Sequence, residues 1–446
     1  MQSKNQKILS GWGNFPIKQC EVFRPERQKD VADIYMEHGA TLVARGAGKS
    51  YGDAALNREG VILSDRLNKF LGFNAERGIV NVQPGVTLAE ILSASIAEGW
   101  FLPVIPGTKY ASAGGCFAAN VHGKNEYKQG EFAANVLNLK LRLPNRELVH
   151  CSEDTNSELY WATAGGMGMT GFIEEIALRL MPISSTKMKV DKVRVDNIEE
   201  MAERMRKGVG NSEYMVGWID HFGSGKNLGQ GIFERASHVK KTEPALANYK
   251  AKEPGLCVPF NLPGFVLNRY SMKLYNQMRF AGIGYSTKSN IKNFEGFFHP
   301  LDGIKNWNRL YGKKGFLQYQ FLVPESDEAV ENIKTILKKI QDKGLFSFLA
   351  VIKYHGPHRG FLSFSDDGFS VALDFPNIPE VHSLLDEIDE FLCTIGGRVY
   401  LAKDARLKPA NFEKMYGDVL PEWRKIIREV NPKHKIYSSM ARRLGF

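Results

Sequence analysis

The sequence predicts an α+β protein built from two units that meet near Ile183. Between Phe23 and Pro182, strand-like and helical segments alternate and are separated by glycine-rich loops, a pattern typical of mixed α+β domains. After Ile183, amphipathic helical segments flank strand-like ones, which predicts helices covering a mostly antiparallel sheet. The chain has 446 residues, 43% of them hydrophobic, and is therefore long enough to bury a large core in two domains.

The first unit begins with a helix and a short strand. The segment from Phe23 to Arg45 predicts a helix, then Gly39, then a strand over 41–44 that runs into glycines. The helix is indicated by apolar residues at helical spacing, namely Val31, Ile34 and Tyr35. Further strands are expected over 60–67 and 78–86.

A second helix is expected over 87–98, because Thr87 and Glu90 form a T-x-x-E capping box and Gly99 can end the helix. The next strand is predicted by leucines that alternate with polar residues, at Leu137, Leu139, Leu141 and Leu143. A turn at 144–146 leads into a strand over 147–151. Another alternation over 176–180 ends at Pro182.

The second unit is predicted to start with a lysine-rich strand over 187–195 and a helix over 198–205. The stretch 223–263 shows no periodicity, and we expect it to be irregular and to form a mobile cover over the site. Amphipathic helices are expected over 327–343 and 380–395, with strands between them over 347–353 and 368–374.

The chain is basic: 59 Lys and Arg against 49 Asp and Glu give a net charge of +10. Such a surplus favours phosphate-bearing or acidic partners, such as nucleic acid, an anionic nucleotide cofactor or a membrane surface. No basic stripe with interleaved aromatic residues and no known nucleic-acid-binding module is present in the sequence, so we expect no nucleic-acid partner.

Five dispersed cysteines without a CxxC pair argue against a disulfide framework and a zinc site, and we predict no metal site. A reducing compartment follows as the simplest location. The N-terminal residues lack the apolar region of a secretory signal, and no stretch reaches the roughly 18 apolar residues of a membrane span. We therefore expect a cytoplasmic protein that is soluble or peripheral at the inner face of the membrane.

Three glycine clusters mark the first unit. The first, over 45–50, ends in G-K-S, but a nucleotide-triphosphate loop also needs glycine at position 43, where the chain has Val43. The others lie over 106–115 and 165–171. Each cluster alone could be a set of tight turns. Together they predict backbone that approaches a large bound cofactor closely, because glycine has no Cβ to keep a ligand away.

The order of these motifs resembles a known class of flavoproteins. The motifs are V-x-x-P at 22–25, R-G-A-G-K-S-Y-G-D at 45–53, V-x-P-G-V-T-L at 82–88, P-G-T at 106–108, G-G at 114–115, H-G-K-N at 122–125 and G-G-x-G-x-T-G at 165–171. They resemble the PCMH-type FAD-binding domain of the vanillyl-alcohol-oxidase flavoproteins. Within that class, the segments 297–302, 315–321, 400–406 and 440–444 are similar to the decaprenylphosphoryl-β-D-ribose 2-oxidase family, the flavin subunit of a decaprenylphosphoryl-ribose epimerase.

The resemblance implies an FAD-binding domain over 1–183, a substrate-binding domain over 184–397 and a C-terminal segment over 398–446 that returns to the FAD domain. It implies FAD contacts at Arg45, Gly46, Ala47, Gly48, Lys49, Ser50, Tyr51, Gly52, Gly107, Ser112, Gly114, Gly115, Asn120, His122, Gly123, Ile173, Tyr400 and Ala402. Many relatives tether the flavin through a histidine in the first loop. Because this chain has Lys49 there, we expect non-covalent FAD; the alternative for Lys49 is an ordinary loop lysine.

Three residues are candidates for handling the proton of an alcohol substrate: Lys403, His122 and Tyr51. Oxidation of a secondary alcohol removes a hydride from carbon and a proton from oxygen, so one group must contact that oxygen. Lys403 could instead be a surface lysine, His122 a structural cap in its loop, and Tyr51 a packing residue beneath the cofactor. The sequence leaves this choice open.

For the substrate side, the resemblance implies Lys353, Gln320, Gln318, Trp218, Phe298 and Lys403 as pocket residues. A lysine suits a phosphodiester anion, and Gln318 and Gln320 share one face of a strand. The alternative is two solvated glutamines on an edge strand. The family's mycobacterial members have cysteine where this chain has Ala372, and tyrosine where it has Phe298.

The function that the resemblance implies is FAD-dependent oxidation of the 2-hydroxyl of a polyprenylphosphoryl-β-D-ribose. An NAD(P)H-dependent keto-sugar reductase would then complete an epimerisation to the arabinose form for envelope glycans. The alternative within enzymes is an oxidase of a soluble sugar alcohol or aldonolactone. Outside enzymes, the alternatives are an electron-carrying flavoprotein, which needs no alcohol site, and a basic nucleic-acid-binding protein.

Overall fold

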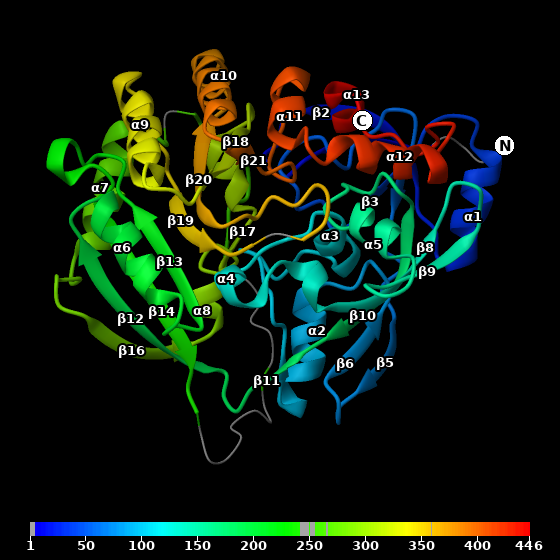
Figure 1. The fold of residues 1–446 in the computed structure, drawn as a ribbon, viewed down its shortest axis with the longest axis horizontal. Coiled ribbons are helices and arrows are strands. Elements are labelled where there is room, and N and C mark those ends of the chain that lie inside the picture. Colours follow the sequence, from blue (N-terminus) through cyan, green and yellow to red (C-terminus); the bar gives the residue numbers. More distant parts are fainter. Residues whose placement is uncertain (1–4, 241–248, 250–254, 265, 358) are drawn as a thin grey trace.

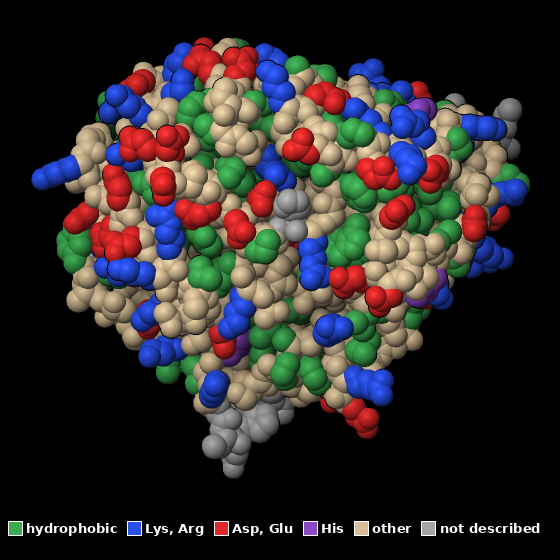
Figure 2. Space-filling model, in the orientation of Figure 1, with side chains coloured by type: hydrophobic (Ala, Val, Ile, Leu, Met, Phe, Trp, Pro, Cys, Tyr) green, Lys and Arg blue, Asp and Glu red, His purple; other side chains and the backbone are tan. Residues whose placement is uncertain are grey.

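The computed structural model describes residues 5–240, 249, 255–264, 266–357 and 359–446 (Figure 1). Helices account for 31% of the described residues and the sheets are mostly antiparallel, which confirms the predicted α+β class. Acidic and basic side chains are interspersed over the face drawn in Figure 2. No helix of the described residues is long and apolar enough to cross a membrane.

The first unit contains two sheets of four or more strands. The smaller has the order β1-β2-β4-β3 and is formed by β1 (Gln6–Ser10), β2 (Ile17–Phe23), β3 (Val43–Arg45) and β4 (Val61–Leu63), with α1 (Gln28–Glu37) between β2 and β3. The larger is five-stranded, in the order β5-β6-β10-β8-β9, formed by β5 (Phe70–Asn74), β6 (Ile79–Val82), β8 (Val136–Arg142), β9 (Leu148–Cys151) and β10 (Phe172–Arg179).

Short helices connect these strands and hold the glycine loops. They are α2 (Leu88–Ser95), η1 (Ile96–Glu98), α3 (Ala113–Ala118), α4 (Glu126–Gln129), η2 (Phe132–Asn135) and α5 (Ser157–Thr163). The predicted capping box of α2 is confirmed, since Glu90 N–H donates to Thr87 Oγ1 while the Glu90 carboxylate accepts from Thr87 N–H. Gly99 ends η1 at a φ of +85°, a conformation that favours glycine.

An eight-stranded antiparallel sheet forms the second unit, in the order β16-β12-β14-β13-β19-β20-β18-β21. Its strands are β12 (Lys187–Val195), β13 (Tyr214–Ile219), β14 (Gly231–His238), β16 (Lys288–Asn293), β18 (Phe316–Pro324), β19 (Ala350–His355), β20 (Gly368–Pro376) and β21 (Arg398–Val399). Three helices cover one face of this sheet: α6 (Ile198–Gly208), α9 (Ala329–Asp342) and α10 (Pro379–Thr394) (Figure 1).

Strand alternation divides the side chains of this sheet between two environments. On β13, a Cβ at Gly217 would meet Met201 and Met205 of α6, whereas its neighbour Trp218 lines a cavity. On β18, the Tyr319 hydroxyl donates to buried Asp389 of α10 over 2.7 Å. The residues on either side of Tyr319 therefore face the cavity. One face of the sheet is apolar and covered by helices, and the other carries polar groups.

The remaining elements are a short strand pair of the first unit and further elements of the second unit and the C-terminus. They are β7 (Trp100–Phe101) paired with β11 (Met181–Pro182), β15 (Leu256–Cys257) paired with β17 (Ile304–Lys305), η3 (Gly225–Asn227), α7 (Arg269–Phe280), α8 (Glu295–Phe298), η4 (Trp307–Tyr311), α11 (Pro409–Tyr416), α12 (Leu420–Val430) and α13 (Ser439–Leu444). The C-terminal helices lie over the first unit (Figure 1).

Several predicted elements differ in extent. The prediction that 223–263 is irregular is wrong in part, because residues 231–238 form β14, which lies between β12 and β13 in the sheet. The strand expected over 78–86 ends at Val82, where the chain turns at Pro84 toward the cavity. Residues 241–248 and 250–254, which the expected mobile cover includes, lie outside the described residues. The proposed division at 183 and 397 stays a prediction.

Candidate active site

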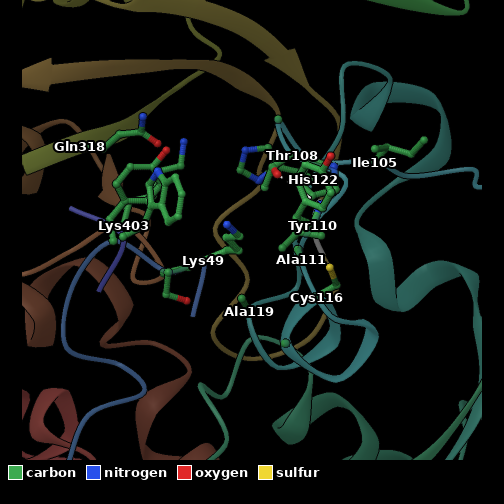
Figure 3. Close-up of a pocket in the computed structure, with 18 of the residues that line it drawn as sticks. Lys49, Ile105, Thr108, Tyr110, Ala111, Cys116, Ala119, His122, Gln318 and Lys403 are labelled. Carbon is green, nitrogen blue, oxygen red and sulfur yellow. Dashed lines mark hydrogen bonds between the residues drawn. The ribbon is translucent and has the colours of Figure 1, made fainter. Parts of the chain in front are cut away.

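A cavity of about 760 Å³ lies between the glycine loops of the first unit and the polar face of the eight-stranded sheet. Loops after β3 and β7 and helix α3 form one wall, and β13, β18, β19 and β20 form the other. Gln318 and Lys403 approach the cavity from one side and His122 and Thr108 from the other (Figure 3). The cavity therefore combines a glycine-lined part with a part rich in titratable side chains.

The first glycine loop presents backbone donors to the cavity. Ala47 N–H donates to Ser112 Oγ over 3.2 Å, and Tyr51 N–H donates to the Ala402 carbonyl over 3.0 Å. Within the described part of the chain, the N–H groups of Gly48, Lys49 and Ser50 have no partner. Unpaired N–H groups in a loop with a left-handed glycine, here Gly48 at φ +64°, form the kind of concavity that binds phosphate anions.

The other glycines in the lining bring backbone segments close together. A Cβ at Gly46 would lie 2.1 Å from Ser112 Oγ, and one at Gly114 would lie 2.6 Å from the Pro84 side chain. Around Gly107, which also lines the cavity, an added Cβ would meet nothing within 4 Å. At Gly46 and Gly114 the loops pack tightly against each other, whereas the open space at Gly107 and the unpaired N–H groups of the first loop leave room for a ligand with a pyrophosphate and flat rings. The site therefore fits FAD on its own geometry.

Four predicted cofactor contacts lie outside this lining: Arg45, Gly52, Asn120 and Gly123. They support the loops from behind. The Arg45 guanidinium donates to the Ser10 carbonyl over 2.7 Å, and a Cβ at Gly52 would lie 1.8 Å from the Asp404 carbonyl oxygen. The Asn120 amide donates to Glu131 over 2.6 Å. Direct cofactor contact at these four positions stays a prediction.

The other predicted cofactor contacts line the cavity. They are Gly46, Ala47, Gly48, Lys49, Ser50, Tyr51, Gly107, Ser112, Gly114, Gly115, His122, Ile173, Tyr400 and Ala402. The Lys49 ammonium lies 3.7 Å above the ring of Trp12, a cation–π contact that the sequence did not indicate. Burial lowers the pKa of Lys49, and Asp302 opposes this shift.

Lys403 and Asp374 form the titratable centre of the sheet side. Burial lowers the pKa of Lys403, and the carboxylate of Asp374 opposes that shift. Burial likewise raises the pKa of Asp374, which accepts a 2.6 Å hydrogen bond from the Gln318 amide. The Lys403 ammonium lies 5.8 Å from the centre of the Tyr51 ring. Burial raises the pKa of Tyr51 well above its ordinary value, so its hydroxyl keeps its proton.

His122 belongs to a chain of buried hydrogen bonds. The Gln320 amide lies 2.9 Å from His122 Nε2 and donates to Ser370 Oγ over 3.1 Å, and Ser370 contacts His355 Nε2 at 2.7 Å. Burial and the nearby Lys353 lower the pKa of His122 well below its usual value, so the ring is neutral. With Nε2 accepting from Gln320, the proton lies on Nδ1, which has no partner among the described residues.

Two more half-buried lysines line the cavity, Lys353 and Lys124. Burial, reinforced by Lys403, lowers the pKa of Lys353 to about 7. Burial also lowers the pKa of Lys124 to about 7, against the pull of Glu234. In the sequence, Lys124 stands out only as part of the H-G-K-N motif. The signal that could have singled it out is a lysine inside a loop of small residues, where the long side chain has no solvent to reach.

The remaining predicted substrate residues, Trp218 and Phe298, also line the cavity. Phe298 packs edge-on against Tyr214 at 4.8 Å between ring centres. Ala372 lies on β20 between Ser370 and Asp374 and presents a methyl group to the same space. Asp374 itself was missed, because its place in a strand with an apolar neighbour on each side gave no sign of a functional site.

Comparison with known proteins agrees with this geometry. The FAD binding domain family matches residues 21–152. The chain is 34% identical to the decaprenylphosphoryl-β-D-ribose oxidase of Mycolicibacterium smegmatis, over 98% of this chain and 97% of that protein. It is 28% identical over 81% of its length to a Streptomyces coelicolor protein named for the mprA 5′ region. The L-gulonolactone oxidase of Bos taurus is 26% identical over only 40% of this chain.

The glycine cradle and the matched domain define the class of protein: it is an FAD-dependent oxidoreductase. The near full-length similarity then gives the family. This chain belongs to the decaprenylphosphoryl-β-D-ribose oxidase family. The lactone oxidases match only 40–41% of the chain at 26% identity, so the alternative of a soluble lactone oxidase has much weaker support.

Proposed function

We propose that this protein oxidises the 2-hydroxyl of a polyprenylphosphoryl-β-D-ribose to the 2-keto sugar. The observation that carries the proposal is the 34% identity to a decaprenylphosphoryl-β-D-ribose oxidase over 98% of the chain. The cavity supports it, because it holds an FAD-sized glycine cradle next to several buried lysines. Lysine side chains suit a sugar that carries a phosphodiester anion.

FAD, when bound, supplies the acceptor for the hydride of the sugar carbinol. Among the three candidates for the hydroxyl proton, Lys403 fits best. Its pKa is lowered by burial, so its neutral amine can accept a proton, whereas Tyr51 keeps its proton and neutral His122 offers Nδ1–H as a donor. In this proposal Lys403 takes the proton, and His122 and Tyr51 orient the sugar.

In this proposal Gln318 and Gln320 bind the sugar together with the lysines. Both side chains point from β18 into the cavity, and each is already bonded on one side, Gln318 to Asp374 and Gln320 to His122. This leaves the Gln320 carbonyl oxygen without a partner among the described residues. A buried acceptor of this kind suits a sugar hydroxyl, because an unpaired buried acceptor is costly. Lys353, on β19, which β20 separates from β18, holds the phosphate in this proposal.

We also propose that the flavin is dissociable. Tethering would require a nucleophilic side chain in the first glycine loop, where the chain has Lys49 held against Trp12. His122 is engaged by Gln320. The product ketone would be consumed by an NAD(P)H-dependent keto-sugar reductase that returns the arabino epimer for envelope glycans. A lipid-linked substrate places the reaction at the inner face of the cytoplasmic membrane.

A visible spectrum of the purified protein tests these points. The flavin band should pass to the supernatant after acid precipitation and, in the intact protein, should bleach under anaerobic addition of farnesylphosphoryl-β-D-ribose. Ribose 5-phosphate at the same concentration is the control, and it should leave the flavin oxidised. Flavin that stays oxidised with the lipid sugar but bleaches with a soluble polyol or lactone would overturn the proposed substrate and retain the oxidoreductase class.

A further inference from the structure

Helix α7 carries a row of exposed apolar side chains. Tyr270, Leu274 and Met278 recur every four residues and are 84%, 59% and 68% exposed. This spacing places them along one side of the helix. Large apolar side chains in a continuous row on a helix surface mark a surface that contacts something apolar.

The opposite side of α7 is anchored to the protein, so its orientation is well defined. Met272 is buried, and the buried Asn276 amide donates to the Asp220 carboxylate over 2.6 Å. Tyr275 stacks on Phe348 at 5.2 Å between ring centres. Packing on the other side of α7 therefore holds the apolar row toward the outside of the molecule. The row does not belong to the hydrophobic core.

The segment that contains α7 is also strongly basic. Between Glu253 and Glu295 the sequence has no Asp or Glu and five basic residues. They are Arg269, Lys273, Arg279, Lys288 and Lys292. Further apolar side chains in this segment are exposed, including Ile291 at 65% and Tyr285 at 58%. Apolar residues interspersed with cations and no anions are typical of helices that lie at the interface of an anionic bilayer.

The same segment forms part of the cavity wall. The Arg279 guanidinium lies 4.6 Å from the Trp218 ring, and Arg279, Trp218 and Lys292 all line the cavity. The exposed row and the cavity are thus separated by the thickness of a single helix.

We propose that α7 and its basic surroundings form the surface by which this protein docks on an anionic membrane. Tyr270, Leu274 and Met278 enter the boundary between headgroups and acyl chains, and Arg269 and Lys273 contact lipid phosphates. Docking itself stands on the exposed row and the charge of the segment. The further step, in which docking delivers the lipid-linked sugar to the cavity, rests on the proposed function.

Sedimentation with lipid vesicles tests the docking. We expect the FAD-loaded full chain to pellet with vesicles of phosphatidylglycerol and phosphatidylcholine, and much less with phosphatidylcholine alone or at high salt. The double variant Leu274→Gln/Met278→Gln should bind at least tenfold more weakly. The matched control is Ile8→Gln/Ile17→Gln, which removes two exposed isoleucines from β1 and β2 and should bind as the unchanged protein does.

Failure of the unchanged protein to bind anionic vesicles would overturn the proposal, as would equal binding by the two double variants. Self-association or capture of a protein through α7 without vesicle binding would also overturn it. A second measurement separates docking from catalysis. Flavin reduction by a short-chain polyprenylphosphoryl ribose in solution should be unchanged in Leu274→Gln/Met278→Gln. Vesicle binding without any such reduction would overturn the proposed function and leave the docking surface intact.

Discussion

At the scale of single residues, the cavity is defined by cations that the fold removes from water. Lys353, Lys124 and Lys403 are all half-buried around the cavity, and desolvation lowers the pKa of each. Such burial is costly to folding unless a ligand supplies the counter-charge. The lysines thus give the site two capacities, a neutral amine that can accept a proton and a cation that can hold a phosphate.

Replacing Lys403 with methionine should slow flavin reduction by the sugar substrate by roughly a hundredfold or more, since general-base groups contribute about that much. FAD content should stay the same, because methionine fills the space of the lysine stem. Stopped-flow absorbance under anaerobic conditions measures the rate. The control is Lys305→Met, which removes an exposed lysine from the same cavity's lining. Equal rates in both variants would exclude Lys403 as the proton acceptor.

The pH dependence of kcat/KM should reveal the charge state of Lys353. Its pKa in the protein is lowered to about 7, so the side chain is charged below that pH and neutral above it. If the charge holds the substrate phosphate, kcat/KM should fall as the pH rises above about 7, because this parameter follows the free enzyme. Lys353→Met should lower kcat/KM below pH 7 and abolish that alkaline limb. An unchanged limb in this variant would assign the fall to another group.

At the scale of elements, two local rules place the site. Alternation along β18 and β19 sends every second side chain to the cavity, which brings Gln318, Gln320 and Lys353 together although they come from separate segments. Asp374 of β20 lies behind this lining, where it accepts a hydrogen bond from Gln318. Glycines permit the opposite wall to approach. Strand alternation and the close approach at glycines each depend on residues within a short segment. Both can therefore be recognised in the sequence once the partner strands are known.

Gly107 offers a test of the glycine wall. An added side chain there meets no protein atom within 4 Å and projects into the cavity. Gly107→Leu should therefore fold normally and bind much less FAD, measured as the ratio of flavin to protein absorbance after purification. Gly39→Leu is the matched control, because Gly39 is equally free of neighbours but lies away from the cavity. Full FAD content in Gly107→Leu would show that the cofactor avoids this part of the cavity.

At the scale of the whole molecule, the C-terminal segment closes the fold onto the glycine loops. Arg443 of α13 bonds both carboxylate oxygens of Asp53, over 2.7 and 3.2 Å, and lies 2.8 Å from Asp404. Asp53 ends the R-G-A-G-K-S-Y-G-D motif, and Asp404 follows Lys403. One buried guanidinium therefore links the cofactor loop, the catalytic candidate and the end of the chain.

Arg443→Met should destabilise the protein by about 3–5 kcal/mol at pH 8, because two buried carboxylates lose their counter-charge. The loss should be smaller at pH 5. Unpaired Asp53, whose pKa burial already raises, takes up a proton more readily in the folded protein than in the unfolded chain, so folded stability recovers as pH falls. Urea denaturation at both pH values measures this.

Arg24→Met, which removes an exposed pair with Asp65, is the control and should change stability little. A loss in Arg443→Met that is the same at both pH values would contradict the charge argument. Loss of FAD from Arg443→Met under conditions where it stays folded would show that the linkage also holds the cofactor loop.

Much of the fold could be predicted because it is coded locally. The strand over 187–195 and the capping box at Thr87 depend on neighbours within four residues, and both were predicted. The stretch that forms β14 could not be predicted, since its residues are strand-like only when paired with β12 and β13 on both sides.

The sequence by itself determined the class of the protein. The glycine motifs, their order and the lack of a nucleotide-triphosphate loop at Val43 are properties of short segments, and they led to an FAD-dependent oxidoreductase. Only the tertiary structure decided which charged residues share one space. Asp374 and Lys403 come from separate segments, as do Lys124 and Glu234, and their pKa shifts arise from burial and from long-range Coulomb interactions that exist only after the chain has folded.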